Sequence, residues 1–241
     1  MKVIFLGTGA GSSLGSKRMM SSIAILTNNY EGFLFDLGSA SFARLEDYNL
    51  LEKIKEVYVT HLHIDHISGI FDFLVHRKVF SSSKVTIYAP EGLSDIFLSL
   101  KKVGNDITYN LYEFSSKLYR RKSDIEIYNV EACHSIKAFS YVIIGDNGKH
   151  KIVYTGDTSE PCEPILEEAQ SADLIIHEMT CLDNCKKWGH TSYMDLLNIF
   201  PNDKLKKVVV THIPSQLETK IEEFSLDKVL KIAYDGLVIE L

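Results

Sequence analysis

Short strand-like runs recur along the whole chain, and each leads into residues that can perform chemistry. The runs are rich in β-branched and aromatic residues, which favour strands, and they cover residues 3–6, 33–35, 57–59, 125–130, 152–154, 174–176 and 208–210. Segments with apolar residues at three-to-four spacing lie between them, which predicts helices at 41–55, 66–80, 93–103, 164–169, 193–199 and 217–233. Strands and helices therefore interleave along the chain, and this predicts an α/β fold.

The polar residues that follow these strands are expected to meet at one edge of the fold. In α/β architectures, ligands gather beyond the carboxyl ends of the strands. Here the residues beyond the strands are Asp36, the segment His61 to His66, His134, Asp157, His177 with Glu178, and His212. Because the strands share this polarity, residues as far apart as positions 36 and 212 can contribute to one site.

The segment His61 to His66 reads HLHIDH and carries three imidazoles and one carboxylate. Neutral imidazole and carboxylate are ligands that divalent zinc, manganese and iron accept. His61 and His63 can both reach one ion, whereas Asp65 and His66 begin a predicted helix, where they can face a second ion. The segment therefore indicates a metal site in preference to a solvated polar loop.

Two metal ions need more ligands than this segment contains. His134, Asp157 and His212 are the best further candidates, because each lies beyond a predicted strand. A carboxylate such as Asp157 can offer one oxygen to each ion, and a hydroxide shared by the ions would be a second bridge. The ions would lower the pKa of bound water toward ~7 and supply a nucleophile at neutral pH.

This order of residues resembles the metallo-β-lactamase superfamily, and the resemblance extends from Gly7 to His212. It implies an αββα sandwich with a dinuclear site at one edge, and we interpret residues 1–241 as one such domain. Asp36 matches the superfamily's buried aspartate, which hydrogen-bonds a ligand histidine. The implied ligands of one metal are His61, His63 and His134, those of the other are Asp65, His66 and His212, and Asp157 bridges the two. Zinc is the default ion, with manganese or iron as alternatives that accept the same ligand set.

Two further segments resemble tRNase Z, the endonuclease family that trims the 3′ end of precursor tRNA. They are the HEMT sequence at residues 177–180 and the GHTS sequence at residues 189–192. In that family the glutamate orients the downstream histidine, which contacts the scissile phosphate and can protonate the leaving oxygen. The resemblance assigns these roles to Glu178 and His190, and the candidate catalytic residues are Asp65, Glu178 and His190. The alternative is a helix cap at Thr191 or Ser192 beside an idle histidine.

One departure from tRNase Z concerns the grip on the tRNA. Those enzymes insert a long arm, rich in glycine and basic residues, between the third histidine motif and the bridging aspartate. Here only 23 positions separate His134 from Asp157, and they predict a hairpin with a turn at residues 145–148. The basic loop at residues 119–122 could touch RNA, although exposed charges are more often simply solvated. The expected substrate is a phosphodiester, either an RNA 3′ end or a small or cyclic nucleotide, and the missing arm favours the latter.

Three other functions share part of this pattern. Hydrolysis of a lactone, thioester or β-lactam would use the same metals, but Glu178 and His190 argue against it. Iron-dependent redox chemistry is disfavoured, because flavodiiron relatives usually carry a glutamate where this chain has His63, and no flavin domain is evident. A binding module without catalysis is disfavoured because all seven ligand positions carry competent residues.

Composition limits the partners and the compartment. The net charge of −6 gives no general attraction to polyphosphate. The four cysteines, at positions 133, 162, 181 and 185, form no CxxC pair, so we expect reduced thiols in a cytoplasmic protein, with Cys181 and Cys185 as disfavoured metal ligands. The sequence shows no leader and no membrane-length apolar run, so no membrane association is expected. The tRNase Z resemblance also implies a homodimer.

Overall fold

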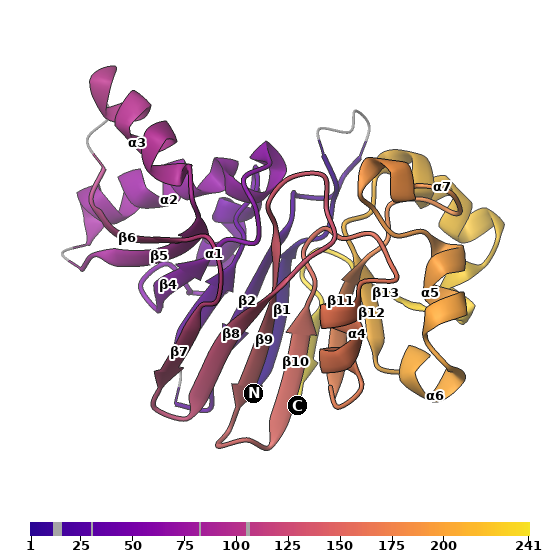
Figure 1. Ribbon diagram of the computed structural model, residues 1–241. Helices are drawn as coiled ribbons and strands as arrows, with labels where there is room; N and C mark the ends of the chain where they lie inside the picture. Colours follow the sequence, from indigo (N-terminus) through magenta and orange to yellow (C-terminus); the bar gives the residue numbers. More distant parts are fainter. Residues whose placement is uncertain (12–15, 30, 82, 105–106) are drawn as a thin grey trace.

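Two seven-stranded β-sheets form the centre of the structure (Figure 1), a computed structural model that describes residues 1–11, 16–29, 31–81, 83–104 and 107–241. The first sheet contains, in spatial order, β14 (Val238–Glu240), β1 (Lys2–Gly7), β2 (Ser22–Leu26), β3 (Gly32–Phe35), β4 (Ile54–Tyr58), β5 (Val85–Pro90) and β6 (Tyr109–Phe114). The second sheet contains β13 (Lys231–Ile232), β12 (Val208–Thr211), β11 (Leu174–Glu178), β10 (His150–Tyr154), β9 (Phe139–Gly145), β8 (Ile125–Glu131) and β7 (Tyr119–Lys122).

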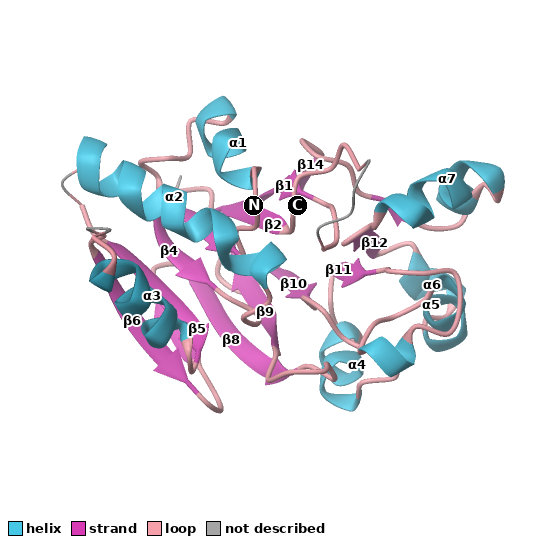
Figure 2. Ribbon diagram, turned by 90° about the horizontal axis from the view of Figure 1, so that it is seen from above, coloured by secondary structure: helices cyan, strands magenta, loops and turns pink. Residues whose placement is uncertain are grey.

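Helices cover the outer face of each sheet (Figure 2). The first sheet packs against α1 (Ser41–Asp47), α2 (Ile64–Phe80) and α3 (Leu93–Lys102). The second sheet packs against α4 (Glu163–Ala169), α5 (Tyr193–Ile199), α6 (Asn202–Leu205) and α7 (Ser215–Glu223). This is the expected αββα sandwich.

Alternating strand residues build the apolar layers of the sandwich, because successive side chains of a strand point to opposite faces. Phe35 of the first sheet and Tyr141 of the second lie in the layer between the sheets, with their ring centroids 5.6 Å apart. Leu34, the neighbour of Phe35, instead faces the helices of the first sheet. Val142, the neighbour of Tyr141, faces the helices of the second sheet.

Parallel strands carry the polar residues to one edge. In the first sheet β3, β4 and β5 are parallel neighbours, and in the second sheet β10, β11 and β12 are. Asp36 follows β3, the HLHIDH segment follows β4, Asp157 follows β10 and His212 follows β12. These residues therefore lie at one edge, as expected, whereas His177 and Glu178 belong to β11 itself and His177 pairs with the buried Glu160.

Two predicted helices end earlier than expected. The segment 41–55 is helical only as α1, because Asn49 takes a left-handed backbone conformation (φ 52°) and Ile54 already begins β4. The segment 217–233 contains the end of α7, a short 3-10 helix at Leu226–Lys228 and strand β13. Ser225, with φ 52°, separates α7 from the 3-10 helix. A three-to-four spacing of apolar residues continues through these turns, so periodicity alone did not reveal them.

The basic residues at 119–122 form the edge strand β7, and the expectation of a loop is wrong. Arg120 lies 3.5 Å from Glu56, Arg121 lies 3.4 Å from Glu126, and Lys122 lies 3.4 Å from Glu31. The basic side chains are thus matched by carboxylates of this chain. Charged residues on an edge strand also oppose edge-to-edge aggregation.

The four cysteines form two disulfides, so the expectation of reduced thiols is wrong. Cys133 pairs with Cys162 and Cys181 pairs with Cys185. The fold brings the Cα atoms of the two pairs to 5.8 and 6.2 Å, a separation that a disulfide spans, and this proximity cannot be read from spacing. Cys181 and Cys185 are therefore not free to bind a metal, and the cysteines no longer indicate a cytoplasmic location.

None of the helices in the described residues combines the length and apolar character that a membrane crossing requires.

Candidate metal centre

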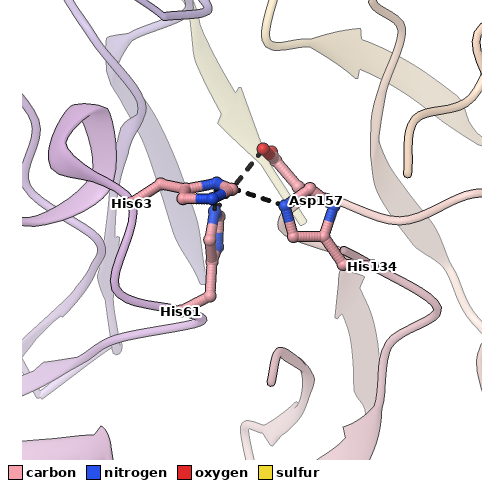
Figure 3. A group of neighbouring side chains, drawn as sticks. All are labelled: His61, His63, His134 and Asp157. Carbon is pink, nitrogen blue, oxygen red and sulfur yellow. Dashed lines mark hydrogen bonds and ion pairs between the residues drawn. The ribbon is translucent and has the colours of Figure 1, made fainter. Parts of the chain in front are cut away.

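The seven predicted ligands meet at one edge of the sandwich in two adjoining groups. The first ligand group consists of His61, His63, His134 and Asp157 (Figure 3), and the second consists of Asp65, His66 and His212. Within each group the ligand atoms lie within 4.8 Å of one another. His63 and the start of α2 come from the first sheet's side, whereas His134, Asp157 and His212 follow strands of the second sheet.

Three ring nitrogens converge in the first ligand group. Nδ1 of His63 lies 3.0 Å from Nε2 of His61 and 3.2 Å from Nε2 of His134. Nitrogen ligands of a tetrahedral zinc ion, bound at ~2.0–2.1 Å, lie about 3.4 Å from one another. The separations of these three nitrogens fit shared ligation of one ion.

Asp157 lies between the two groups and presents one oxygen to each. Its Oδ2 lies 3.5 Å from Nε2 of His61, and its Oδ1 lies 3.3 Å from Nε2 of both His66 and His212. The geometry suits a bridging carboxylate.

Two buried polar atoms at the centre lack hydrogen bonds. Nε2 of His66 and Oδ1 of Asp157 approach each other without the alignment of a hydrogen bond, and neither has another hydrogen-bond partner among the described residues. Leaving a buried polar group unpaired costs about 1–3 kcal/mol. A cation between these atoms would remove that cost, so the donor set fits a metal ion.

The electrostatics of the site also favour a bound cation. Burial lowers the pKa of His61 and of His63, and neighbouring imidazoles lower both further, which favours the neutral rings that metal ligation requires. Burial opposes the charged form of Asp157, but His212 and His66 hold the pKa of its carboxyl well below the usual range. Burial likewise lowers the pKa of His66, but Asp157 and Asp36 raise it well above its usual value. Positive charge is thus favoured between these carboxylates.

Asp36 anchors ligands of both groups from outside. Its Oδ2 lies 2.8 Å from Nδ1 of His66 and accepts hydrogen bonds from the hydroxyls of Thr60 (2.9 Å) and Tyr154 (2.8 Å). Thr60 in turn lies 2.9 Å from Nδ1 of His61. These contacts leave Nε2 of each ring directed to the centre. Sequence reasoning identified Asp36 but missed Thr60 and Tyr154, whose only signal was their position at strand ends.

The carbonyl of Gly189 orients the ring of His134 by accepting a hydrogen bond from its Nδ1, 2.8 Å away. Gly189 has a left-handed backbone conformation (φ 79°), and a Cβ at this position would lie only 2.8 Å from the Ser135 nitrogen. A glycine is therefore needed for the loop that carries His190 to pack against the loop that carries His134.

Glu178 and His190 form a pair beside the two ligand groups. Nδ1 of His190 lies 2.9 Å from Oε1 of the buried Glu178 and 3.9 Å from Oδ2 of Asp157. Burial lowers the pKa of His190, but the hydrogen bond and charge of Glu178, followed by Asp157 and Asp65, raise it to about 9. His190 also lies within 4.8 Å of ligand atoms of Asp157 and His212.

The helix cap beside His190 exists as well. Ser192 caps α5 and forms a reciprocal capping box with Asp195, while Thr191 donates a hydrogen bond to the carbonyl of Thr158. The capping interpretation thus explains Ser192 but leaves the contact between His190 and Glu178 unexplained.

The amino-terminal loop touches the site through Gly11, whose N–H donates a 2.8 Å hydrogen bond to Oδ2 of Asp65. Arg18 lies elsewhere in this loop and pairs with Glu218 at 2.7 Å. It also donates to Thr8 and to the carbonyl of Ala233, which ties the loop to the carboxyl-terminal region.

Comparisons with known proteins agree with the fold. A family model for the anti-Pycsar protein Apyc1 matches residues 1–231. Ribonuclease Z of Pyrococcus horikoshii is 28% identical over 266 aligned positions, which cover 88% of this chain and 86% of that protein. The structure of human tRNase Z, short form, is 23% identical with a TM-score of 0.82, and the match covers 100% of this chain and 99% of that one. The metallo-β-lactamase fold protein YhfI of Bacillus subtilis has the same identity, TM-score and coverage.

Proposed function

The chain belongs to the family of the anti-Pycsar protein Apyc1, and we propose that it is a metal-dependent phosphodiesterase that acts on small or cyclic nucleotides. The observation that carries this proposal is the pair of Glu178 and His190, which lies beside two groups of metal-ligating side chains. Similarity to a ribonuclease Z over most of the chain supports phosphodiester chemistry. Residues from both sheets form the site, which supports the interpretation of residues 1–241 as one domain.

Two divalent ions fit the site, with zinc as the default. His61, His63 and His134 would hold one ion, Asp65, His66 and His212 the other, and Asp157 would contact both. When bound, such ions neutralise charge on a phosphoryl group and activate water.

His190 is suited to protonate the leaving oxygen. Its Nδ1 is held by Oε1 of Glu178, which leaves Nε2 to face a substrate. The hydrogen bond and charge of Glu178 raise the pKa of His190, which favours the protonated ring that a proton donor needs. General acid catalysis of this kind contributes about 10²–10⁴-fold to the rate.

The structure supports a small substrate more than a tRNA. The segment between His134 and Asp157 contains the hairpin of β9 and β10, whose strands pair from Gly145 and His150 onward. The alignment with the Pyrococcus ribonuclease Z covers more positions than the whole of this chain, so that relative carries insertions. The basic side chains of β7 each lie near a glutamate, which offsets the positive charge that they would offer to RNA.

The test compares three substrates with the zinc- and manganese-loaded protein: bis(p-nitrophenyl) phosphate, a panel of cyclic mononucleotides, and a precursor tRNA. We expect metal-dependent turnover of the first two and little trimming of the tRNA. The variant Asp157→Ala, which removes the shared carboxylate, is the inactive control. Protein with two bound metals and no activity on any phosphodiester would overturn the proposal, and turnover of the tRNA alone would show that the enzyme is a ribonuclease instead.

We retain the homodimer as part of this proposal. Light scattering coupled to size-exclusion chromatography checks it, and a single monomeric peak at micromolar concentration would contradict it.

A further inference from the structure

The hydroxyl of Thr180 lies between a predicted metal ligand and the carboxylate that holds His190. Its Oγ1 lies 2.7 Å from Oε2 of Glu178 and 3.2 Å from Nδ1 of His212. An ionised carboxylate can only accept hydrogen bonds, so the hydroxyl donates to Glu178. The hydroxyl oxygen then accepts the N–H of His212, which requires the proton of that ring to be on Nδ1.

This proton placement matters for metal binding. A neutral imidazole protonated on Nδ1 has its free lone pair on Nε2. Nε2 of His212 lies 3.3 Å from Oδ2 of Asp65 and 3.3 Å from Oδ1 of Asp157. The hydroxyl of Thr180 therefore directs the ligating nitrogen of His212 toward the second ligand group.

The other ligand group contains the same arrangement. There the hydroxyl of Thr60 lies 2.9 Å from Nδ1 of His61 and donates to Oδ2 of Asp36. Each group thus contains a histidine whose outer nitrogen reaches a buried carboxylate through a threonine hydroxyl. The recurrence of this geometry on two unrelated segments supports a common task.

The carboxylate that accepts the hydrogen bond of Thr180 belongs to Glu178, and unlike Asp36 it also contacts His190. Oε1 of Glu178 lies 2.9 Å from His190 and accepts a 2.8 Å hydrogen bond from the backbone N–H of Thr158, while Oε2 accepts from Thr180. Both oxygens of this buried group are occupied, so its position is well defined. One carboxylate therefore orients both a metal ligand and the general acid.

We propose that Thr180 is a positioning residue, whose hydroxyl sets the tautomer and orientation of His212 for the second metal and joins this ligand to the pair of Glu178 and His190. The role of His190 in this proposal rests on the proposed function, whereas the role of His212 does not. Removing a group that orients a metal ligand typically lowers metal affinity about 10–100-fold.

Three variants test this proposal. Thr180→Val keeps the shape of the side chain but removes the hydroxyl, and Thr180→Ser restores a hydroxyl. Thr211→Val is the matched control, because Thr211 precedes His212 and is equally a threonine, but its buried hydroxyl has no hydrogen-bond partner among the described residues. Zinc affinity is measured by competition with a chromophoric chelator, and the absorption bands of the cobalt-loaded protein report the coordination of each ion.

We expect Thr180→Val to lower the affinity for the second equivalent of zinc about 10–100-fold and to change the cobalt spectrum. Thr180→Ser should recover most of the affinity, and Thr211→Val should match the unaltered protein. Unchanged affinity in Thr180→Val, or a serine variant no better than the valine variant, would overturn the proposal. These readouts require no turnover, so a protein that binds metals as described but cleaves no phosphodiester would refute the proposed function and leave the role of Thr180 intact.

A second measurement serves if Thr180→Val does not fold. In the zinc-loaded unaltered protein, ¹⁵N NMR of the histidine rings should show His212 protonated on Nδ1. A ring protonated on Nε2 would overturn the proposal.

Discussion

Nδ1 of His190 lies 2.9 Å from Oε1 of Glu178. This contact adds a candidate proton donor to the candidate metal ligands, so the site contains more than residues that could bind ions. Glu178 is fully buried, whereas the His190 side chain keeps 17% of its exposure and can meet a substrate. A buried carboxylate that orients a partly exposed imidazole is the arrangement that general acid catalysis needs.

His190→Ala should lower kcat on a phosphodiester about 10²–10⁴-fold, because it removes the proton donor. Metal content should stay nearly unchanged, since each ligand group keeps its own side chains without His190. Steady-state kinetics and elemental analysis of the same preparation check both points. Loss of one metal would instead show that His190 is a ligand together with Asp157 and His212, whose ligand atoms lie within its reach.

Asp36→Asn should weaken metal binding about 10–100-fold, because an amide cannot accept all the hydrogen bonds that the carboxylate accepts. The carboxylate receives donors from Thr60, His66 and Tyr154. Isothermal titration with zinc measures the change. The control is Tyr154→Phe, which removes only one hydrogen bond to Asp36 and should cost less affinity than Asp36→Asn. Equal affinities for Asp36→Asn and the unaltered protein would contradict the role assigned to Asp36.

The buried pair of His177 and Glu160 should make stability depend on pH. Burial lowers the pKa of His177, but the hydrogen bond and charge of Glu160, 3.2 Å away, raise it above its usual value. Because the folded pKa exceeds the unfolded one, the stabilisation is complete below pH ~6.5 and is lost as the pH rises through the folded value.

Glu160→Gln should therefore destabilise the protein most at low pH, by about 3 kcal/mol at pH 6, and less as the pH rises. Denaturant unfolding of both proteins at pH 6, 7.5 and 9 measures the difference. Both proteins carry the same metal ligands, so the pH dependence of metal binding cancels. A difference that is constant across this range would contradict a charged His177.

Removing the disulfide between Cys181 and Cys185 should affect catalysis more than metal binding. This bond lies in the loop between β11 and α5, and the backbone N–H groups of Trp188 and His190 both donate to the carbonyl of Cys185. A displacement of His190 by about 1 Å would lower kcat about 10²-fold. The double serine variant, with the corresponding variant of Cys133 and Cys162 as comparison, tests this by kinetics and metal analysis. Full activity in the Cys181 and Cys185 variant would show that the loop holds His190 without the bond.

Much of the fold and the set of candidate ligands follow from local features of the sequence. Strand-forming runs alternate with helical segments, and residues such as Asp157 and His212 come directly after strands, so a parallel arrangement brings them to one edge. The strands β2, β5, β6, β7, β13 and β14 were not predicted. The ends of α1 and α7 were placed too late, because apolar periodicity does not report left-handed residues in turns.

The contacts that decide what each side chain does depend on packing between distant segments. His212 and Asp65 are 147 positions apart, yet their ligand atoms lie 3.3 Å from each other. Only the tertiary structure shows which nitrogen of each histidine ring faces the centre of the site. It also places the hydroxyls of Thr60 and Thr180 against Nδ1 of His61 and His212, and it brings the cysteines together in pairs. Residue type and strand position are properties of short stretches of chain, whereas hydrogen-bond partners across two sheets exist only once both sheets have packed.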